Sequence, residues 1–367
     1  MNRFEHYQKL FDANRMDEVA ESAEGLLWLK VKAITRRKLI DDYCRARHPE
    51  VVGGKLREQA ARLYTEMLAD AGQAHINIDR YIKSVAPARS RHDLERIASE
   101  LHKMRHFSWG GDYSNALDRF LVDRYIKTYD SYDTIQRMLE TEIPAAVSGY
   151  VKCSWYNHWS TILIEHLFRR HDKVLPAIGN IKKVDFFIDN IPFDLKVTYL
   201  PANYVKVKRK QAKLKDELSE LKEAARNNGL FFDKSAKPKN IAYEITERIK
   251  ASDNDACKRV LHMQRMFRRR LVNECAQNPE ELLKNLYEKQ GEMRFDASNR
   301  LFIILADTRE FEDSWKLKRN PNLLKTHINA YLDNFSARKV KQRKITFTHR
   351  ARSGEFTAVA DAIFAIV

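Results

Sequence analysis

Two aspartates and a lysine stand close together within residues 184–199, and their types and spacing suit metal-assisted chemistry. Asp185 is followed nine residues later by Asp194, and Lys196 comes two residues after that. Hard divalent cations such as Mg²⁺ prefer oxygen ligands, which carboxylates supply. Such a cation polarises a phosphoryl oxygen and lowers the pKa of a bound water. A lysine beside it would stabilise negative charge developing on a phosphate.

The same stretch predicts two strands joined by a short turn. β-Branched and aromatic residues flank the turn-forming residues 189–192. Successive side chains of a strand point to opposite faces. One face of the second strand would therefore be apolar, with Phe193, Leu195 and Val197. Asp194 and Lys196 would lie on the other face, with Asp185 approaching from the partner strand.

This constellation resembles the PD-(D/E)XK nuclease superfamily, which has the restriction-endonuclease-like fold. The family pattern is an acid at the end of one strand and, after a gap, D/E-x-K on the next. Asp185 followed by Asp194, Leu195 and Lys196 fits that pattern, with Val184 in place of the proline. The resemblance implies Mg²⁺, with Mn²⁺ as a substitute, held by Asp185 and Asp194. It also implies that Lys196 positions water and stabilises charge.

The resemblance extends upstream to residues 154–168, which have the pattern of an amphipathic helix. Its predicted core stripe consists of Leu163, Ile164, Leu167 and Phe168. The corresponding helix of the superfamily commonly carries a glutamate that reaches the metal. Glu165 is therefore the expected additional metal ligand and catalytic residue. Asn157, on the same helix, is expected to contact the nucleic acid by orienting a phosphate or a water.

The order of the remaining elements predicts an α/β fold with a restriction-endonuclease-like mixed-sheet core. Residues 1–142 read as an all-helical N-terminal domain, and the proline-containing stretch 143–146 reads as its boundary. Residues 143–367 would form the nuclease core, interrupted at about 206–296 by a basic helical insertion. After the insertion, strands are predicted at 300–307 and 344–348 and a helix at 322–335. The tail 356–367 is ambiguous between helix and strand.

Composition favours a soluble protein with a polyanionic partner. The 367 residues are 44% hydrophobic and 32% charged, with a formal net charge of +16. This favours nucleic acid, DNA first, over a membrane, and no apolar run is long enough to span a bilayer. The four cysteines are scattered without a CxxC pair, so neither a disulfide framework nor a zinc site is expected. A cytoplasmic location is the simplest inference.

Basic residues gather in two further stretches. Residues 258–270 hold six Lys or Arg and no acid, ending in Arg268, Arg269 and Arg270. This run is expected to bind the phosphates of a nucleic acid. The alternative is that it forms a charged helix face exposed to solvent. Residues 338–352 hold seven Lys or Arg and no acid, a second candidate phosphate surface. Trp109, beside two glycines, suggests either a base-stacking residue or a loop aromatic folded back on its domain.

Together these features predict a Mg²⁺-dependent DNA endonuclease with a role in restriction or anti-phage defence. One active site cuts one strand, so double-strand cleavage would need a homodimer or a paired complex. The alternatives are an RNA-directed nuclease and a nucleic-acid-binding protein with an inactive nuclease fold. Motifs for NTP hydrolysis, zinc proteolysis and serine hydrolysis (GxxxxGK[ST], HExxH and GxSxG) do not occur.

Overall fold

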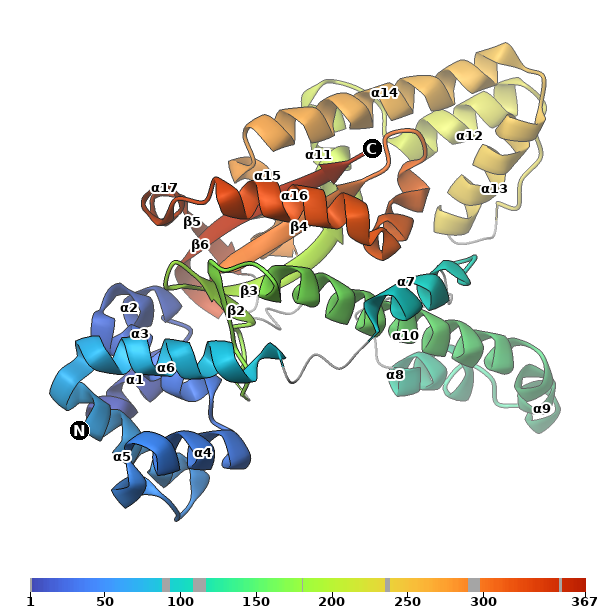
Figure 1. The fold of residues 1–367 in the computed structure, drawn as a ribbon. Coiled ribbons are helices and arrows are strands. Elements are labelled where there is room, and N and C mark those ends of the chain that lie inside the picture. The colour runs from blue at the N-terminus through green and yellow to red at the C-terminus, as the bar shows by residue number, and fades with distance from the viewer. Residues whose placement is uncertain are drawn as a thin grey trace.

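The computed structural model describes residues 2–87, 93–107, 117–179, 181–234, 238–289, 298–349 and 352–367. Within these residues the chain is an α/β protein whose helices surround a six-stranded sheet (Figure 1). The strands are β1 Val174–Pro176, β2 Phe186–Ile188, β3 Ile191–Tyr199, β4 Arg300–Ala306, β5 Lys344–His349 and β6 Arg352–Ile366. The predicted α/β class is confirmed. Trp109 lies outside the described residues.

The sheet is mixed, with the order β1-β2-β3-β4-β6-β5. The first three strands pair antiparallel, β4 is parallel to β3, and β6 is parallel to β4. β5 is the last strand in this order and pairs antiparallel with β6. The predicted strands at 300–307 and 344–348 correspond to β4 and β5. The ambiguous tail is a strand, because it lies in β6 between two other strands.

The predicted hairpin is confirmed, with a two-residue turn between β2 and β3. Asp189 and Asn190 both have positive φ, 45° and 64°. Positive φ at both central residues is the requirement of a type I′ turn, and Asp and Asn tolerate that conformation. The turn fixes the register in which Phe186 lies opposite Phe193. This register places Asp185 beside Phe193, the residue before Asp194, and the Phe193 carbonyl accepts the Asp185 N–H.

Helices cover both faces of the sheet. One face packs on α10 Glu142–Arg169, α16 Pro321–Asp333 and α17 Ala337–Gln342, together with the 3₁₀ segment η5 Phe311–Arg319. The other packs on α11 Ala202–Gln211, α14 Asp255–Gln277 and α15 Glu280–Lys289. Phe193 and Leu195 belong to the core under α10, α16 and α17. Phe302, which lies opposite Lys196 in the β3–β4 register, belongs to the core under α11, α14 and α15. The polar face of β3 is therefore covered by helices of the insertion.

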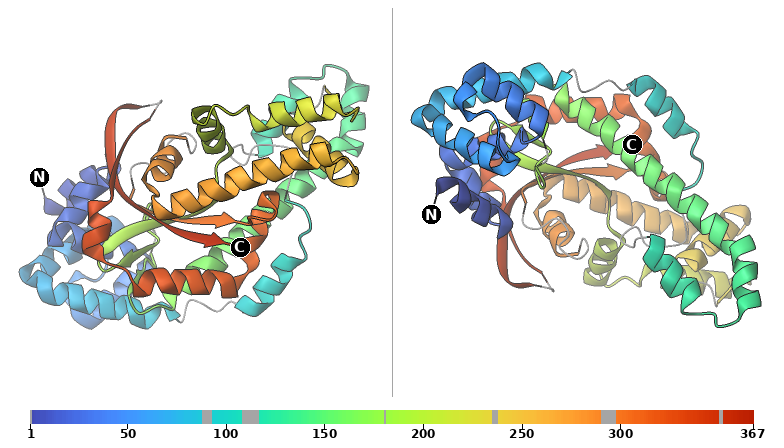
Figure 2. Two further views of the ribbon diagram at one scale, coloured as in Figure 1. Left: turned by 90° about the horizontal axis from the view of Figure 1, so that it is seen from above. Right: turned by 90° about the horizontal axis from the view of Figure 1, so that it is seen from below.

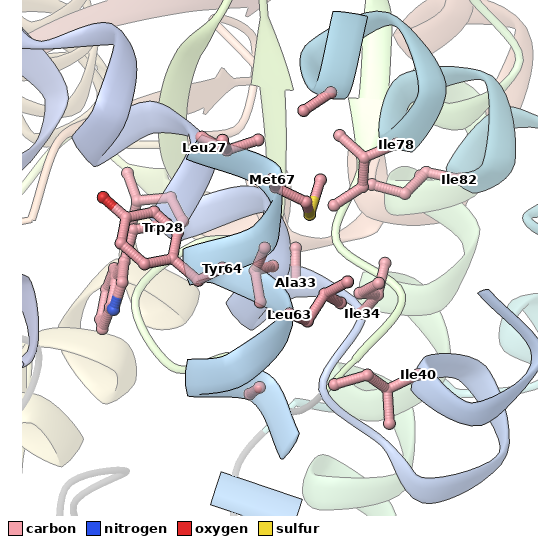
Figure 3. Close-up of a cluster of buried hydrophobic side chains, with 14 of the residues drawn as sticks. Leu27, Trp28, Ala33, Ile34, Ile40, Leu63, Tyr64, Met67, Ile78 and Ile82 are labelled. Atoms are coloured by element: carbon pink, nitrogen blue, oxygen red, sulfur yellow. The ribbon is translucent and has the colours of Figure 1, made fainter. Parts of the chain in front are cut away.

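The first six helices form a core of their own (Figure 3). They are α1 Arg3–Asp12, α2 Met16–Glu21, α3 Ala23–Ala33, α4 Arg37–Arg47, α5 Leu56–Met67 and α6 Ala71–Val85, with short 3₁₀ turns η1 Pro49–Val51 and η2 Leu68–Asp70. This core also contains Val184 and Phe187, so it packs on the hairpin. A Cβ at Gly179 would lie 2.7 Å from the Ala33 carbonyl oxygen, so this close approach requires glycine.

The rest of the predicted N-terminal region packs on α10. It comprises α7 Leu94–His102, α8 Leu117–Leu121, the π-helical η4 Val122–Ile126 and α9 Tyr132–Glu140. Ile97 and Leu101 of α7 share a core with Tyr156 of α10. Pro144 lies in the first turn of the 28-residue α10, where proline is tolerated, so it does not mark a linker. The division into domains at residue 142 stays a prediction.

The predicted helical insertion contains α11, α14 and α15 together with α12 Glu217–Asn227 and α13 Pro238–Ala251. α11 and α12 are separate helices, because the chain turns at Lys213, whose φ is 57°. α12, α13 and the start of α14 share a small core of their own. Figure 2 shows these helices extending beyond the sheet, on the same side as the N-terminal half of α10.

Candidate functional site

Asp185 is held by backbone hydrogen bonds on both sides and lies directly before β2. Its N–H donates to the Phe193 carbonyl (2.8 Å), and its own carbonyl accepts from the Ala177 N–H (2.9 Å). Its carboxylate Oδ2 accepts from the backbone N–H of Leu195 at 2.7 Å. The side chain of Asp185 therefore reaches across to β3, between the two other residues of the predicted motif.

Asp194 and Lys196 form an ion pair at the centre of the sheet. Lys196 Nζ lies 2.8 Å from Asp194 Oδ1. Asp194 is only 6% exposed, and its N–H donates to the Asn299 carbonyl of the neighbouring chain segment. Its second carboxylate oxygen, Oδ2, is buried without a hydrogen bond to any described residue. Such an oxygen is unusual and is a suitable ligand for a cation.

Arg300 is a further residue of this site that the sequence did not reveal. It begins β4 directly opposite Asp194, and its Nε lies 3.6 Å from Asp194 Oδ2. The side chain is 5% exposed, and its guanidinium lies over the Tyr287 ring at 4.5 Å. A buried arginine here balances part of the charge of Asp194 and fixes its orientation. The pattern around residue 300 indicated only a buried strand, because the partner across a parallel pair is not encoded locally.

Glu165 joins the site from α10. Its carboxylate accepts from Arg169 Nη2 at 2.9 Å, one turn along the same helix. Burial raises the pKa of Glu165, while the positive charges of Arg169 and Lys196 act against that rise. The Glu165 carboxylate thus lies within electrostatic range of Lys196. The structure brings all four residues of the predicted catalytic set into one region.

Two other carboxylates lie close enough to Asp185 to affect its ionisation. Burial raises the pKa of Asp185 to about 6, and the charges of Asp194 and Glu165 add to the rise. The Leu195 N–H and Lys196 oppose it. A divalent cation would relieve this repulsion, and Mg²⁺ is commonly held by one or two carboxylates plus waters and substrate phosphates. Among the described residues, no three His, Cys, Asp or Glu form a ready-made metal cage. The two aspartates nevertheless fit an ion bound in this more open way.

Asn157 has a different partner from the one expected. Its side-chain oxygen accepts from Lys318 Nζ at 2.9 Å, so this oxygen is already engaged within the protein. Lys318 belongs to η5, is 8% exposed, and lies over the Tyr199 ring at 5.5 Å. Burial lowers the pKa of Lys318 to about 8. The contact joins α10 to η5, and no sequence motif marked Lys318.

Replacing Lys318 by methionine is expected to stabilise the protein at pH 7. The pKa is lowered from 10.5 to about 8, so the folded chain binds this proton less tightly than the unfolded chain. The shift corresponds to a destabilisation of the folded chain by up to about 3 kcal/mol. This destabilisation is present in full below pH 8 and disappears as the pH rises towards 10.5. Urea unfolding of both proteins from pH 7 to 10 measures the difference. A constant difference across this range would contradict the burial of a charged amine.

The three consecutive arginines of α14 do not form one uncompensated cluster. Arg268 donates to Glu217 at 2.9 and 2.7 Å and to Glu312 at 3.1 Å. Arg270 Nε lies 3.6 Å from Glu274, in an exposed pair. Arg269 is exposed and has no ion pair with a described residue. The prediction that no acid neutralises the run is wrong for Arg268, because its acids come from α12 and η5, far away in sequence.

Comparison with known proteins adds no family. No protein-family model, curated protein or solved structure matches this chain. In the part of the chain that the structure describes, no helix is both long and apolar enough to cross a membrane. The geometry of the site itself is therefore the basis for a function of this chain.

Proposed function

We propose that this protein is a Mg²⁺-dependent endonuclease that hydrolyses phosphodiester bonds in DNA. The observation that supports this most is the meeting of Asp185 and Lys196 around the buried carboxylate of Asp194, with Glu165 in electrostatic range. A carboxylate whose pKa is raised by burial and by a second carboxylate, beside a lysine, is suited to a cation and a phosphate. A random D-x-K sequence on a solvated strand would not be buried or carry a second acid.

The order of the elements also supports a restriction-endonuclease-like core. α10 is followed by β1, β2 and β3, then by helices, and then by β4 parallel to β3. This helix, three strands, helix and strand order is the one expected for the PD-(D/E)XK superfamily. The insertion α11–α15 occupies the position of the second helical element. A role in restriction or anti-phage defence is part of the proposal and rests on the superfamily alone. A cytoplasmic location is also proposed, from the scattered cysteines.

Each side chain has a distinct role in this proposal. Asp185 and Asp194 would hold Mg²⁺ or Mn²⁺, with Glu165 supporting them. A bound divalent cation polarises the phosphate and lowers the pKa of an attacking water. Lys196 donates to an oxygen of the scissile phosphate and stabilises its developing charge. Arg300 keeps the Asp194 carboxylate in one orientation, through the 3.6 Å contact and its position over Tyr287.

The direct test is to incubate supercoiled plasmid, linear duplex DNA and RNA with the protein in Mg²⁺, Mn²⁺ or EDTA. We expect nicking or linearisation of the plasmid in both metals and none in EDTA. Cleavage of RNA alone would assign the site to an RNA-directed nuclease. Binding without cleavage of any substrate would instead favour a nucleic-acid-binding protein with an inactive nuclease fold. Comparing methylated with unmethylated genomic DNA then tests whether modification controls cleavage.

The ion pairs of Arg268 change what is expected of the basic run on α14. Arg268→Ala should lower the free energy of unfolding by roughly 1 to 3 kcal/mol, because it leaves Glu217 and Glu312 without their partner. Its effect on the salt dependence of DNA binding should be small. Arg269→Ala should leave stability unchanged and flatten the slope of log K against log salt by up to about 0.9, the value for one phosphate contact.

Urea unfolding and a salt titration of duplex binding measure the two effects. The two alanine variants serve as controls for each other, because they remove the same side chain from adjacent positions of one helix. Equal flattening by both variants would mean that Arg268 leaves its acids to bind phosphate. A loss confined to one DNA sequence would indicate base reading by these arginines.

A further inference from the structure

The insertion contains a groove between α14 and the α11–α12 segment, with a volume of about 930 Å³. Its apolar lining consists of Leu214, Ala224, Ala256, Val260, Met263, Met266 and Phe267. Met263 is 65% exposed, Met266 44% and Leu214 43%, so the apolar surface is open to solvent. Exposed apolar grooves of this kind mark interaction sites, and methionines adapt to the shape of a bound helix.

The groove is basic at both ends. On α14, Arg259, Met263, Met266 and Arg270 follow one another at intervals of four, three and four residues, so they form one stripe along the helix. The two arginines are separated by 11 residues, about 16 Å along the helix axis. Arg270 has an exposed 3.6 Å contact with Glu274 and lies over the Phe267 ring at 5.5 Å, and Arg259 has no ion pair with a described residue. An occupant of this groove should be apolar in the middle and acidic towards its ends.

Two other cations of the lining are already neutralised inside the insertion. Arg209 pairs with Glu220 at 2.6 Å, and Lys215 pairs with Glu223 at 2.7 Å. The charge available to an incoming partner is therefore that of the two arginines of α14.

The chain itself carries a helix with these properties. α9 has Tyr132, Ile135 and Leu139 on one face, at the i, i+3 and i+7 positions. None of its residues is buried, and Tyr132 is 79% and Leu139 49% exposed. Asp133 and Glu140 flank this face at the two ends of the helix. Residues 128–142 contain four acids and one base, in a chain whose net charge is +16.

We propose that α9 of one copy binds in the insertion groove of a second copy. Tyr132 and Leu139 would lie against the methionines, and Asp133 and Glu140 would pair with Arg259 and Arg270. Within one chain, α9 packs on α10 and η4, and Figure 1 shows it at the end of α10, apart from α14. The α9 of another copy is therefore the occupant that fits. A reciprocal exchange buries both grooves and closes with two-fold symmetry.

This interaction does not depend on the proposed nuclease activity. If that activity is present, the dimer places two active sites in one particle, which cleavage of both strands of a duplex requires. If it is absent, the association of the chains remains testable by itself. The dimer hypothesis and the nuclease hypothesis can therefore be refuted independently of each other.

Sedimentation equilibrium of the full-length chain tests the proposal with three charge variants. The groove variant is Arg259→Glu with Arg270→Glu, and the helix variant is Asp133→Arg with Glu140→Arg. The control, Lys38→Glu with Arg47→Glu, makes the same charge change as the groove variant on exposed residues of α4. We expect a wild-type dimer, at least a tenfold higher dissociation constant for the groove and helix variants, and a change below threefold for the control.

The decisive arm mixes the groove variant with the helix variant. In such a mixed dimer one contact joins the two altered surfaces and the other joins two wild-type surfaces, so both contacts pair opposite charges. Association should therefore return to within threefold of wild type in the mixture. Circular dichroism melts check that each variant is folded, and Leu139→Ser, expected to weaken the dimer at least tenfold, tests the apolar part without a charge change.

Three results would overturn this assignment. The first is a wild-type chain that stays monomeric at the highest concentration at which it remains dissolved. The second is an equal loss of association in the control, because it would show a general charge effect. The third is a groove variant with wild-type association but weakened duplex binding, which would assign the groove to nucleic acid.

Discussion

Replacing Lys196 by alanine or Asp194 by asparagine is expected to lower the rate of DNA cleavage by roughly 10² to 10³ or more. Lys196 Nζ and Asp194 Oδ1 are 2.8 Å apart at the centre of the site, so each change removes a group that would face the scissile phosphate. Single-turnover nicking of supercoiled plasmid in Mg²⁺ measures the effect. DNA binding should change little in both variants, and the melting temperature of each variant is measured to check that it is folded in the assay.

Asparagine is preferable to alanine at position 194 for a structural reason. Arg300 is only 5% exposed, and its Nε lies 3.6 Å from Asp194 Oδ2. Asp194→Ala would remove the Asp194 carboxylate from that buried guanidinium and is expected to cost several kcal/mol of stability, roughly 3 to 5. Asparagine keeps the size of the side chain and one oxygen.

The control for these variants is Asp189→Asn. Asp189 is an exposed acid of the hairpin turn, and asparagine tolerates its positive φ of 45°. It should cleave DNA like the wild-type protein. Near wild-type nicking by both Lys196→Ala and Asp194→Asn would refute the proposed active site.

Removing divalent metal is expected to abolish cleavage entirely, and Ca²⁺ is expected to restore DNA binding without restoring cleavage. Ca²⁺ enters oxygen-lined sites, but its longer bonds and variable geometry position and activate water less well than Mg²⁺ does. Mn²⁺ should support cleavage. Fluorescence anisotropy of a labelled duplex, run beside the nicking assay in each metal, separates binding from catalysis.

A readout independent of catalysis is the effect of Mg²⁺ on thermal stability. A ligand that binds only the folded state raises the melting temperature, so Mg²⁺ should stabilise the wild-type protein. The stabilisation should be lost in Asp185→Asn and kept in Asp189→Asn, because only Asp185 reaches the site. Cleavage that persists in excess EDTA would contradict the mechanism.

The sequence by itself determined the local elements around the site. The alternation in β3, the turn residues Asp189 and Asn190 and the stripe on α10 produced the hairpin and the helix that the structure contains. It also selected Asp185, Asp194, Lys196 and Glu165, which the structure brings together. These features depend on residues within one turn or one strand of each other, so periodicity and turn chemistry encode them directly. The chemistry inferred from the four residues stays a proposal.

Only the tertiary structure decided the neighbours of these residues across the chain. Arg300 reaches Asp194 because β4 runs parallel to β3 in one particular register. Arg268 is neutralised by Glu217 and Glu312, which lie 51 and 44 residues away. Lys318 engages Asn157 from 161 residues away. Charge is balanced over distances in space and not along the chain, so a local count of acids and bases cannot determine which charges remain for a ligand.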